Sequence, residues 1–247
     1  MGSFFVKKEE KMEKENILGF NVITYYFEKL VEEIYKDYEN NEQLFIVNVN
    51  PEIAVANYKN KEFKEILNKQ KYQIPDGSGI VWASKKNNGK IETRITGIDL
   101  MLKLCEKSQN YSSRIFLYGA KQEIVEKAAK ELETKYPEIN IVGTCNGYEK
   151  EEKAVKQIQK SNADIVFVGL GSPKQEEFII KNKEKLKNVK IIMPVGGSYD
   201  VISKTKKRAP NWMIKCNIEW LYRLIQEPKR IFRQVNLFKF IFLVIFK

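Results

Sequence analysis

The chain has 247 residues, a formal net charge of +11 and no histidine, which excludes histidine-dependent nucleophilic catalysis and histidine-containing metal sites. Its three cysteines, Cys105, Cys145 and Cys216, are far apart, which argues against a zinc site and is typical of a reducing compartment. The charge is concentrated at residues 204–247, where eleven basic residues against two acidic ones give +9 and leave +2 for the remainder. Both an anionic membrane surface and a nucleic acid are partners that suit such a segment.

The first half of the chain predicts helices separated by short strands. The first fifteen residues are charged, so no signal peptide is expected, and no apolar run is long enough for a membrane-spanning helix. Helical spacing of apolar residues follows over residues 24–38, and the β-branched run at 44–49 is typical of a strand. Pro51 suits the first turn of the next helix, and a further helix is predicted over residues 61–69.

Residues 74–79, Ile-Pro-Asp-Gly-Ser-Gly, place a single carboxylate, Asp76, between a proline and two glycines, just before a predicted helix. Pro75 fixes its own φ, whereas Gly77 and Gly79 permit positive φ and a close approach of another molecule. The turn can present Asp76 as a catalytic group, or Asp76 can be a helix N-cap that binds backbone N–H groups. From these six residues alone, the N-cap is the favoured interpretation.

The remainder of the chain up to residue 195 alternates regularly between strands and helices. A helix is predicted to begin at Thr96 or Gly97 and to end near Ser108. Strands that are apolar on both faces indicate an α/β fold with a Rossmann-like, mostly parallel sheet flanked by helices, whose ligands lie at the carboxyl ends of the strands. Strands are predicted over residues 114–119, 139–143, 164–168 and 190–195, and helices over 122–136, 149–160 and 173–186.

Two strand ends in this region are candidate ligand sites. The turn from Gly169 to Gly171 precedes a helix, so its backbone N–H groups can hold a phosphate, although the turn lacks the dinucleotide-binding spacing and is also consistent with an ordinary βα turn. Tyr148 can stack on a base or simply pack. No two of the five aspartates form an Asp-x-Asp pair, the usual clamp for a metal-bound nucleotide diphosphate, so no metal is expected.

The C-terminal segment combines basic residues with large apolar ones. A turn is predicted at residues 196–200, a helix after Pro210 and another after Pro228. We expect Trp220 and Leu221 to pack on the domain. By contrast, the apolar residues 238–246 are expected to lie in a membrane interface, because a terminus so close to many cations has no obvious place in a core.

Five motifs, in this order, resemble the WecG/TagA/CpsF glycosyltransferase family over residues 17–233. The resemblance implies an inverting, metal-independent transferase without a cofactor, which takes a sugar from a UDP donor to an undecaprenyl-diphosphate-linked acceptor. The motifs are P-D-G-x-G at 75–79, R-x-T-G-x-D-L at 94–100, G-x-G-x-P-x-Q-E at 169–176, G-G-S-Y-D at 196–200, and R-A-P-x-W at 208–212 followed by E-W-x-x-R-L-x-x-E-P-x-R at 219–230.

The TagA-like branch of this family implies a specific reaction. Its donor is UDP-N-acetylmannosamine and its acceptor is GlcNAc-diphospho-undecaprenol, a step that commits the acceptor to wall teichoic acid. Other donors, such as UDP-N-acetylmannosaminuronic acid or UDP-glucose, remain open. So does a different class, a non-catalytic nucleotide-binding or nucleic-acid-binding α/β protein, although no recognised nucleic-acid module is present and we expect no nucleic acid as partner.

The resemblance also assigns roles to individual residues. Asp76 matches the proposed general base and Arg94 is placed with it at the catalytic centre. Independently, a chain without histidine or an Asp-x-Asp pair needs a carboxylate as base, and backbone N–H groups and arginines to meet the charge of the leaving diphosphate. Asn48 stands where TagA-like members often carry threonine, which leaves the donor sugar open. The residues expected to bind the donor are Asn48, Asn50, Tyr148, Gly169, Gly171, Gln175 and Glu176, and the arginines expected over the diphosphate are Arg223, Arg230 and Arg233.

These features predict three parts of the chain: a charged tail at residues 1–16, a catalytic α/β domain at 17–195, and a basic, aromatic appendage at 196–247. The appendage is expected to bind an anionic membrane surface and to complete the active site, so deletion from about residue 198 should abolish transfer without unfolding the domain. The expected location is cytoplasmic, peripheral on the inner face of the cell membrane. The oligomeric state, including a homo-oligomer, stays open.

Overall fold

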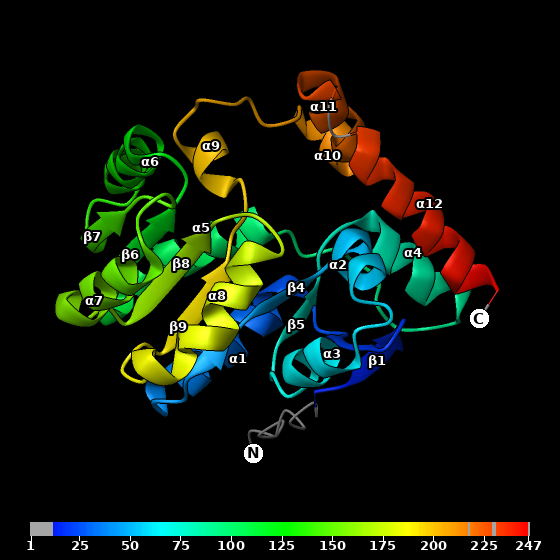
Figure 1. Cartoon of the computed structure of the whole chain (residues 1–247), viewed down its shortest axis with the longest axis horizontal. Helices are drawn as coiled ribbons and strands as arrows, with labels where there is room; N and C mark the ends of the chain where they lie inside the picture. The colour runs from blue at the N-terminus through cyan, green and yellow to red at the C-terminus, as the bar shows by residue number, and fades with distance from the viewer. Residues whose placement is uncertain (1–11, 217, 229–230, 247) are drawn as a thin grey trace, which may run out of the picture.

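A five-stranded parallel sheet lies at the centre of the computed structural model, which describes residues 12–216, 218–228 and 231–246 (Figure 1). All neighbouring strands in it run in the same direction, which confirms the predicted α/β fold with a mostly parallel sheet. In spatial order, its strands are β3 (Leu44–Phe45), β9 (Ile191–Pro194), β8 (Ile165–Gly169), β6 (Arg114–Gly119) and β7 (Asn140–Cys145).

Both faces of this sheet are apolar because successive side chains along each strand point to opposite faces. In β6, Ile115 and Leu117 join one buried cluster, whereas Phe116 and Tyr118 join another. The first cluster is covered by α1 (Phe27–Glu39), α5 (Gly97–Ser108, with Thr96 as its N-cap) and α6 (Gln122–Lys135). The second is covered by α7 (Glu151–Ser161) and α8 (Lys174–Asn182), with short 3-10 turns at η1 (Gln109–Tyr111) and η2 (Lys183–Leu186) elsewhere.

The order of the strands reverses between β6 and β8. From β6 the chain passes through α6 to β7 on one side, and from β8 it passes through α8 to β9 on the other. The two strand ends are pressed together, because a Cβ on Gly119, whose φ is +130°, would lie 2.3 Å from the carbonyl oxygen of Gly169. In open α/β sheets, this point of reversal is where ligands bind.

The predicted strand at residues 44–49 is divided between two sheets. The backbone N–H of Ile46 donates to the carbonyl of Ile192 in the large sheet, but the N–H of Val47 donates to the carbonyl of Tyr72. The second half is therefore a separate strand, β4 (Val47–Val49), parallel to β5 (Gln73–Pro75). Beside them lie the helices α2 (Pro51–Ala56), α3 (Lys61–Asn68) and α4 (Ser78–Lys86).

An antiparallel hairpin that the sequence did not predict precedes these elements. It consists of β1 (Lys14–Ile17) and β2 (Phe20–Ile23), and β1 begins inside the segment expected to be a charged tail. The hairpin contributes buried apolar side chains, Phe20 and Val22 among them, to the same cluster as β4 and α2.

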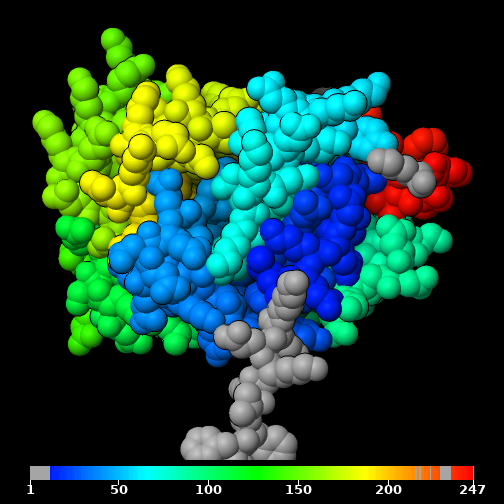
Figure 2. Space-filling view, turned by 90° about the horizontal axis from the view of Figure 1, so that it is seen from below, coloured from blue at the N-terminus to red at the C-terminus, as the bar shows by residue number. Residues whose placement is uncertain are grey.

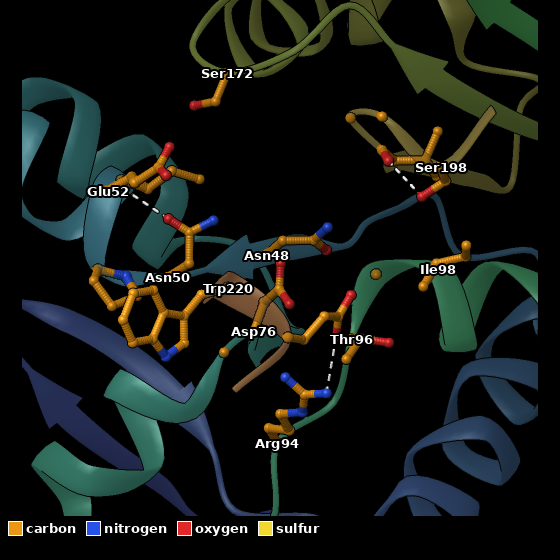
Figure 3. Close-up of a pocket in the computed structure, with 18 of the residues that line it drawn as sticks. Asn48, Asn50, Glu52, Asp76, Arg94, Thr96, Ile98, Ser172, Ser198 and Trp220 are labelled. Carbon is orange, nitrogen blue, oxygen red and sulfur yellow. Dashed lines mark hydrogen bonds and ion pairs between the residues drawn. The ribbon is translucent and has the colours of Figure 1, made fainter. Parts of the chain in front are cut away.

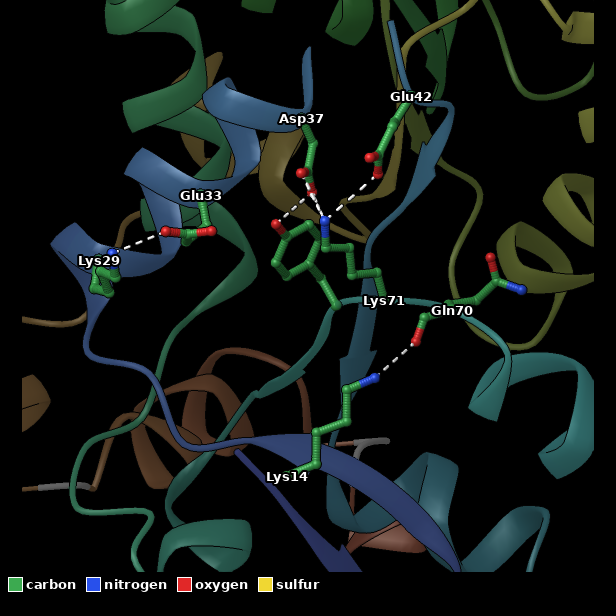
Figure 4. A network of polar contacts seen from close by, with 8 residues as sticks. Lys14, Lys29, Glu33, Asp37, Glu42, Gln70 and Lys71 are labelled. Carbon is green, nitrogen blue, oxygen red and sulfur yellow. Dashed lines mark hydrogen bonds and ion pairs between the residues drawn. The ribbon is translucent and has the colours of Figure 1, made fainter. Parts of the chain in front are cut away.

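A polar network ties the segment before β5 to α1 (Figure 4). The buried carboxylate of Asp37 accepts hydrogen bonds from the Tyr72 hydroxyl at 2.5 Å and from the Lys71 ammonium at 2.6 Å. Lys71 also pairs with Glu42, and Lys14 of β1 donates to the carbonyl of Gln70. Because both its oxygens have donors, Asp37 is tolerated at a buried position.

After the large sheet, the described residues form the helices α9 (Ser198–Ile202), α10 (Asn211–Lys215), α11 (Glu219–Gln226) and α12 (Ile231–Ile245). The turn predicted at residues 196–200 is thus partly helical. Its Tyr199 is buried in the core and its hydroxyl donates to the carbonyl of Phe167 at 2.7 Å. We call residues 204–246 the tail below.

The helix α12 packs across α2 and α4, and Figures 1 and 2 both show it in red along this edge of the molecule. Phe240 is fully buried and Val244 is nearly so, whereas Phe238 and Phe242 are 72% and 60% exposed. The expectation that residues 238–246 have no place in a core was therefore wrong for one stripe of the helix. The expectation that Trp220 and Leu221 pack was also wrong, because both are exposed. Within the described residues, no helix is long and apolar enough to cross a membrane.

Candidate functional site

Two adjoining cavities lie at the carboxyl ends of the parallel strands. The first, of about 310 Å³, contains Asp76 and is called the Asp76 cavity. The second, of about 500 Å³, contains Tyr148 and is called the Tyr148 cavity. The residues that line both are Gly171, Gly196, Gly197, Val201 and Glu219.

Asp76 follows β5 directly and lines its cavity next to Asn48 and Asn50 (Figure 3). Its backbone N–H donates to the carbonyl of Val49 at 2.8 Å, which continues the pairing of β4 with β5. The N-cap of the following helix is Gly77, with φ of +104°, so the favoured interpretation of Asp76 as the N-cap was wrong. The carboxylate is instead placed on the wall of a cavity.

Glycines let the elements around Asp76 approach closely. A Cβ on Gly79 would lie 2.5 Å from Pro51, and a Cβ on Gly97 would lie 2.6 Å from the Asn48 amide nitrogen. The starts of α4 and α5 can therefore approach Pro51 and Asn48, at the end of β4, only because these positions lack side chains.

Asn48 and Asn50 both carry amide groups on the cavity wall. The Asn48 nitrogen donates to the carbonyl of Pro194 at 2.9 Å, whereas its Oδ1 has no hydrogen-bond partner among the described residues. The Asn50 Oδ1 accepts from the N–H of Ile53 and caps α2, so its nitrogen is the atom that remains for a ligand. Since Asn48 is only 6% exposed, its unpaired oxygen is a costly feature that a bound donor group would relieve.

Arg94 also lines the Asp76 cavity and is paired with the tail. Its Nη2 donates to Glu219 Oε2 at 2.9 Å, the ion pair marked by the dashed line from Arg94 in Figure 3. A second ion pair between tail and body has the charges reversed. Here the tail supplies the cation, Arg208, which donates to both oxygens of Asp99, at 2.7 and 2.8 Å. Asp99 in turn accepts from the hydroxyl of Thr96, the N-cap of α5.

Gln175 holds the turn that the two cavities share. Its Oε1 accepts from the backbone N–H of Gly196 at 2.9 Å, and its nitrogen donates to Glu176 Oε1, also at 2.9 Å. Glu176 is buried behind Gln175 and does not line either cavity, so it bears on the site through Gln175. Burial raises the pKa of the Glu176 carboxyl, although the hydrogen bond from Gln175 opposes this change.

The Tyr148 cavity lies at the point where the strand order reverses. Residues following β6 and β8, including Lys121 and the Gly169–Gly171 turn, form part of its wall. Tyr148 itself is 79% exposed, and its backbone N–H donates to Asn146 Oδ1. A ring held in this way at the rim is available for stacking.

The two cavities differ in charge. The described residues that line the Asp76 cavity include three acids, Glu52, Asp76 and Glu219, against one arginine, Arg94. Those that line the Tyr148 cavity include four cations, Lys121, Lys206, Lys207 and Arg208, against the three acids Asp200, Glu219 and Glu227. An anionic ligand is therefore better matched to the Tyr148 cavity, and a neutral one to the Asp76 cavity.

The structure thus brings Asp76, Arg94, Asn48, Asn50 and Gln175 to one cavity, and Tyr148 and Gly169 to the other, with Gly171 between them. Of the expected tail arginines, Arg230 and the side chains of Arg223 and Arg233 lie outside the described residues. Sequence reasoning gave no role to Glu219, Trp220 and Leu237, which also line the Asp76 cavity. The available signal for Glu219 was that it is one of only two acids in a strongly basic segment. In the described part of the chain, no group of acidic and cysteine side chains is arranged to hold a metal ion.

The fold and the site define an α/β protein whose paired cavities lie at the carboxyl edge and switch point of a parallel sheet. Residues 15–247 match the model of the glycosyl transferase WecG/TagA/CpsF family, and the chain belongs to this family, as the sequence motifs predicted. Relatives carry the name N-acetylglucosaminyldiphosphoundecaprenol N-acetyl-beta-D-mannosaminyltransferase. The one from Bacillus subtilis (strain 168) is 40% identical over 196 residues, 79% of this chain and 76% of the relative. The one from Staphylococcus aureus (strain MW2) is 36% identical over 232 residues, 92% of this chain and 91% of the relative.

Proposed function

We propose that this protein is an inverting, metal-independent glycosyltransferase that moves N-acetylmannosamine from UDP-N-acetylmannosamine to GlcNAc-diphospho-undecaprenol. The observation that carries the proposal is the junction of an acidic cavity containing Asp76 with a basic cavity at the switch point of the sheet. The printed names of relatives that align over most of their own lengths support this choice of donor and acceptor.

Asp76 is the proposed general base. In the reaction, an acceptor hydroxyl attacks the anomeric carbon of the donor, the bond from that carbon to the UDP oxygen breaks, and the hydroxyl proton passes to the Asp76 carboxylate. Gly77 has a positive φ, and a Cβ there would meet only Pro51, at 3.9 Å, so this glycine leaves space beside the carboxylate for an acceptor sugar. Arg94 is the cation of the same cavity and is proposed to stabilise the negative charge that develops during transfer.

The Tyr148 cavity is the proposed site of the UDP group. The uracil would stack on the exposed Tyr148 ring, and the diphosphate would lie near the N–H groups of the Gly169–Gly171 turn and the cations around it. The tail arginines Arg223, Arg230 and Arg233 are proposed to add to this charge. The transferred sugar would then sit at the shared turn, within reach of the amides of Asn48, Asn50 and Gln175.

The exposed stripe of α12 is the proposed membrane contact. Val235, Phe238, Phe242 and Ile245 are exposed on this helix, Phe246 is exposed just after it, and Lys239 lies among them. Apolar side chains flanked by cations suit the surface of an anionic bilayer, where the lipid-linked acceptor resides. The protein would then work at the inner face of the cell membrane.

The membrane contact is tested with vesicles that contain anionic lipid. We expect the double variant Phe238→Ser/Phe242→Ser to pellet at least about tenfold more weakly, because two exposed rings lose their burial in the bilayer. Tyr26→Ser, which removes a ring that is 57% exposed outside the tail, is the matched control and should pellet like the unmodified protein. Equal pelleting of the double variant and the control would refute the proposed contact.

The transfer reaction is tested by measuring UDP release with a lipid-diphospho-GlcNAc analogue, in the presence of EDTA, across a panel of UDP-sugars. UDP-N-acetylmannosamine should be the preferred donor and EDTA should leave the rate unchanged. Faster turnover with UDP-glucose or with the uronic acid would contradict the proposed donor. No acceptor-dependent turnover with any sugar would contradict the proposed class of enzyme and favour a nucleotide-binding protein.

A further inference from the structure

Glu219, the first residue of α11, is an acid in a tail that is otherwise strongly basic. Its side chain is only 5% exposed, and it lines both the Asp76 cavity and the Tyr148 cavity. A buried carboxylate is retained at such a position only with a partner that offsets the loss of hydration. The partner of Glu219 is therefore part of the structure where the two cavities meet.

The partner of Glu219 in the body of the protein is Arg94, across 125 residues of sequence, at 2.9 Å. Both side chains are largely buried in this ion pair. A guanidinium is a rigid, planar fork with five N–H donors, so fixing one of its nitrogens fixes the direction of the others. The carboxylate of Glu219 thus decides where the remaining donors of Arg94 point within the cavity.

A second ion pair between tail and body lies close to the first in sequence, and its charges are reversed. Here the tail supplies the cation, Arg208, and the body supplies the anion, Asp99. Arg94 and Asp99 stand at the two ends of a short segment that includes the N-cap Thr96. Because the charges alternate, the tail can satisfy both pairs only in one register along this segment.

We propose that Glu219 is a positioning residue, which holds the Arg94 guanidinium at the junction of the two cavities so that transfer requires the tail to be in place. This inference rests on the proposed function for the reaction in which Arg94 takes part. Glu219 contacts no reacting atom in this scheme, and it acts through the direction that it gives to Arg94. Binding of UDP alone depends on the cations of the Tyr148 cavity and should therefore be spared.

The test compares Glu219→Gln and Glu219→Asp with Glu131→Gln. Glu131 pairs with Lys204, so its variant also breaks an ion pair between tail and body, but Glu131 lines neither cavity. We expect Glu219→Gln to lower kcat by about 100-fold, the scale of a misplaced catalytic group, with the Kd for UDP changed less than about threefold. Glu219→Asp, which keeps the charge, should recover at least a tenth of the unmodified kcat. Glu131→Gln should keep kcat within about twofold.

Three results would overturn the proposal: a kcat of Glu219→Gln within about twofold of the unmodified protein, a loss as large in Glu131→Gln, or no recovery in Glu219→Asp. Tryptophan fluorescence, measured without substrate, distinguishes failure of the positioning role from failure of the proposed function. In a Trp82→Phe/Trp212→Phe background, Trp220 is the remaining tryptophan and lies next to Glu219. Its emission should shift to longer wavelength in Glu219→Gln, even if no UDP-sugar is turned over, and unchanged emission would overturn the positioning role.

Discussion

The Asp76 cavity and the Tyr148 cavity adjoin but differ in the charge of the residues that line them. The first is lined by an excess of acids and by amide side chains, and it contains the carboxylate that follows β5. The second is lined by an excess of cations and lies where the strand order reverses. Sugar transfer from a nucleotide needs both, because a neutral hydroxyl must lose a proton while a diphosphate accumulates charge. In the proposed reaction, this difference in charge separates proton removal from stabilisation of the leaving diphosphate.

The tail is what the two cavities have in common. Its residues Glu219, Trp220 and Leu237 line the Asp76 cavity, and its basic cluster around Arg208 lines the Tyr148 cavity. The tail also buries Phe240 and Val244 against the body. It is therefore a structural part of both cavities, in addition to its proposed contact with a membrane.

The largest expected effect comes from removing the tail. A chain that ends after Ser203 keeps Tyr199 in the core, which a cut at residue 198 would remove. We expect transfer to fall more than about 1,000-fold, since both cavities lose a wall and Arg94 loses its partner. Transfer is measured by UDP release.

The control for this truncation is far-ultraviolet circular dichroism, which should retain the signal of the α/β domain. The melting temperature should be lower, because the surfaces of α2 and α4 under α12 become exposed. A folded truncation that still transfers sugar at the full rate would show that the cavities are complete without the tail.

A smaller and more selective effect is expected at Tyr148. Loss of a stacked ring costs ~1–3 kcal/mol per base, so Tyr148→Ala should raise the Kd for UDP by about tenfold or more. At saturating donor, kcat should stay within about threefold, because the base lies in the other cavity. Calorimetry with UDP measures the first quantity, and Tyr26→Ala, an exposed tyrosine outside both cavities, is the matched control. A loss of kcat without a change in Kd would break the proposed division between the cavities.

The smallest effect concerns Glu176, which supports Gln175 from behind the shared turn. Because burial raises the folded-state pKa of this acid above its ordinary value of 4.5, the folded protein binds more protons than the unfolded chain, and stability falls as the pH rises above 4.5. Glu176→Gln removes this dependence and keeps an acceptor for Gln175. The melting temperature of Glu176→Gln relative to the unmodified protein should therefore increase as the pH rises from 4.5 through the folded-state pKa of Glu176, and then level off.

A pH series of thermal melts checks this prediction. Glu184→Gln, at an exposed position in η2, is the control and should give a curve parallel to that of the unmodified protein. Parallel curves for Glu176→Gln as well would mean that the carboxyl of Glu176 does not contribute to the pH dependence.

The sequence predicted the large sheet well because its strands are apolar on both faces, a pattern that local inspection can read. It did not predict that residues 44–49 divide, since the reason is a change of hydrogen-bond partner between Ile46 and Val47. Nor did it predict the β1–β2 hairpin, whose first strand is half charged. The inner stripe of α12 was missed because Phe240 is buried by α2 and α4, which are far away in sequence.

The candidate site was predicted in part for the same reason. Motifs located Asp76, Arg94 and Gln175, which the structure places in one cavity. The separation of Tyr148 into a second cavity, and the ion pair between Arg94 and Glu219, depend on how distant segments meet. The residues next to each of these positions in the sequence do not indicate which distant segment they will contact, and one sequence alone gives no other information on such contacts.

The proposal that proton transfer occurs in the Asp76 cavity and nucleotide binding in the Tyr148 cavity is tested most directly by kinetics and calorimetry on Asp76→Asn. This substitution removes the proposed base and changes the size of the side chain little. We predict that kcat with UDP-N-acetylmannosamine falls at least about 1,000-fold, while the Kd for UDP stays within about threefold of the unmodified value. Turnover that persists, or a parallel loss of UDP affinity, would contradict the assignment of proton transfer to the Asp76 cavity and of the nucleotide to the Tyr148 cavity.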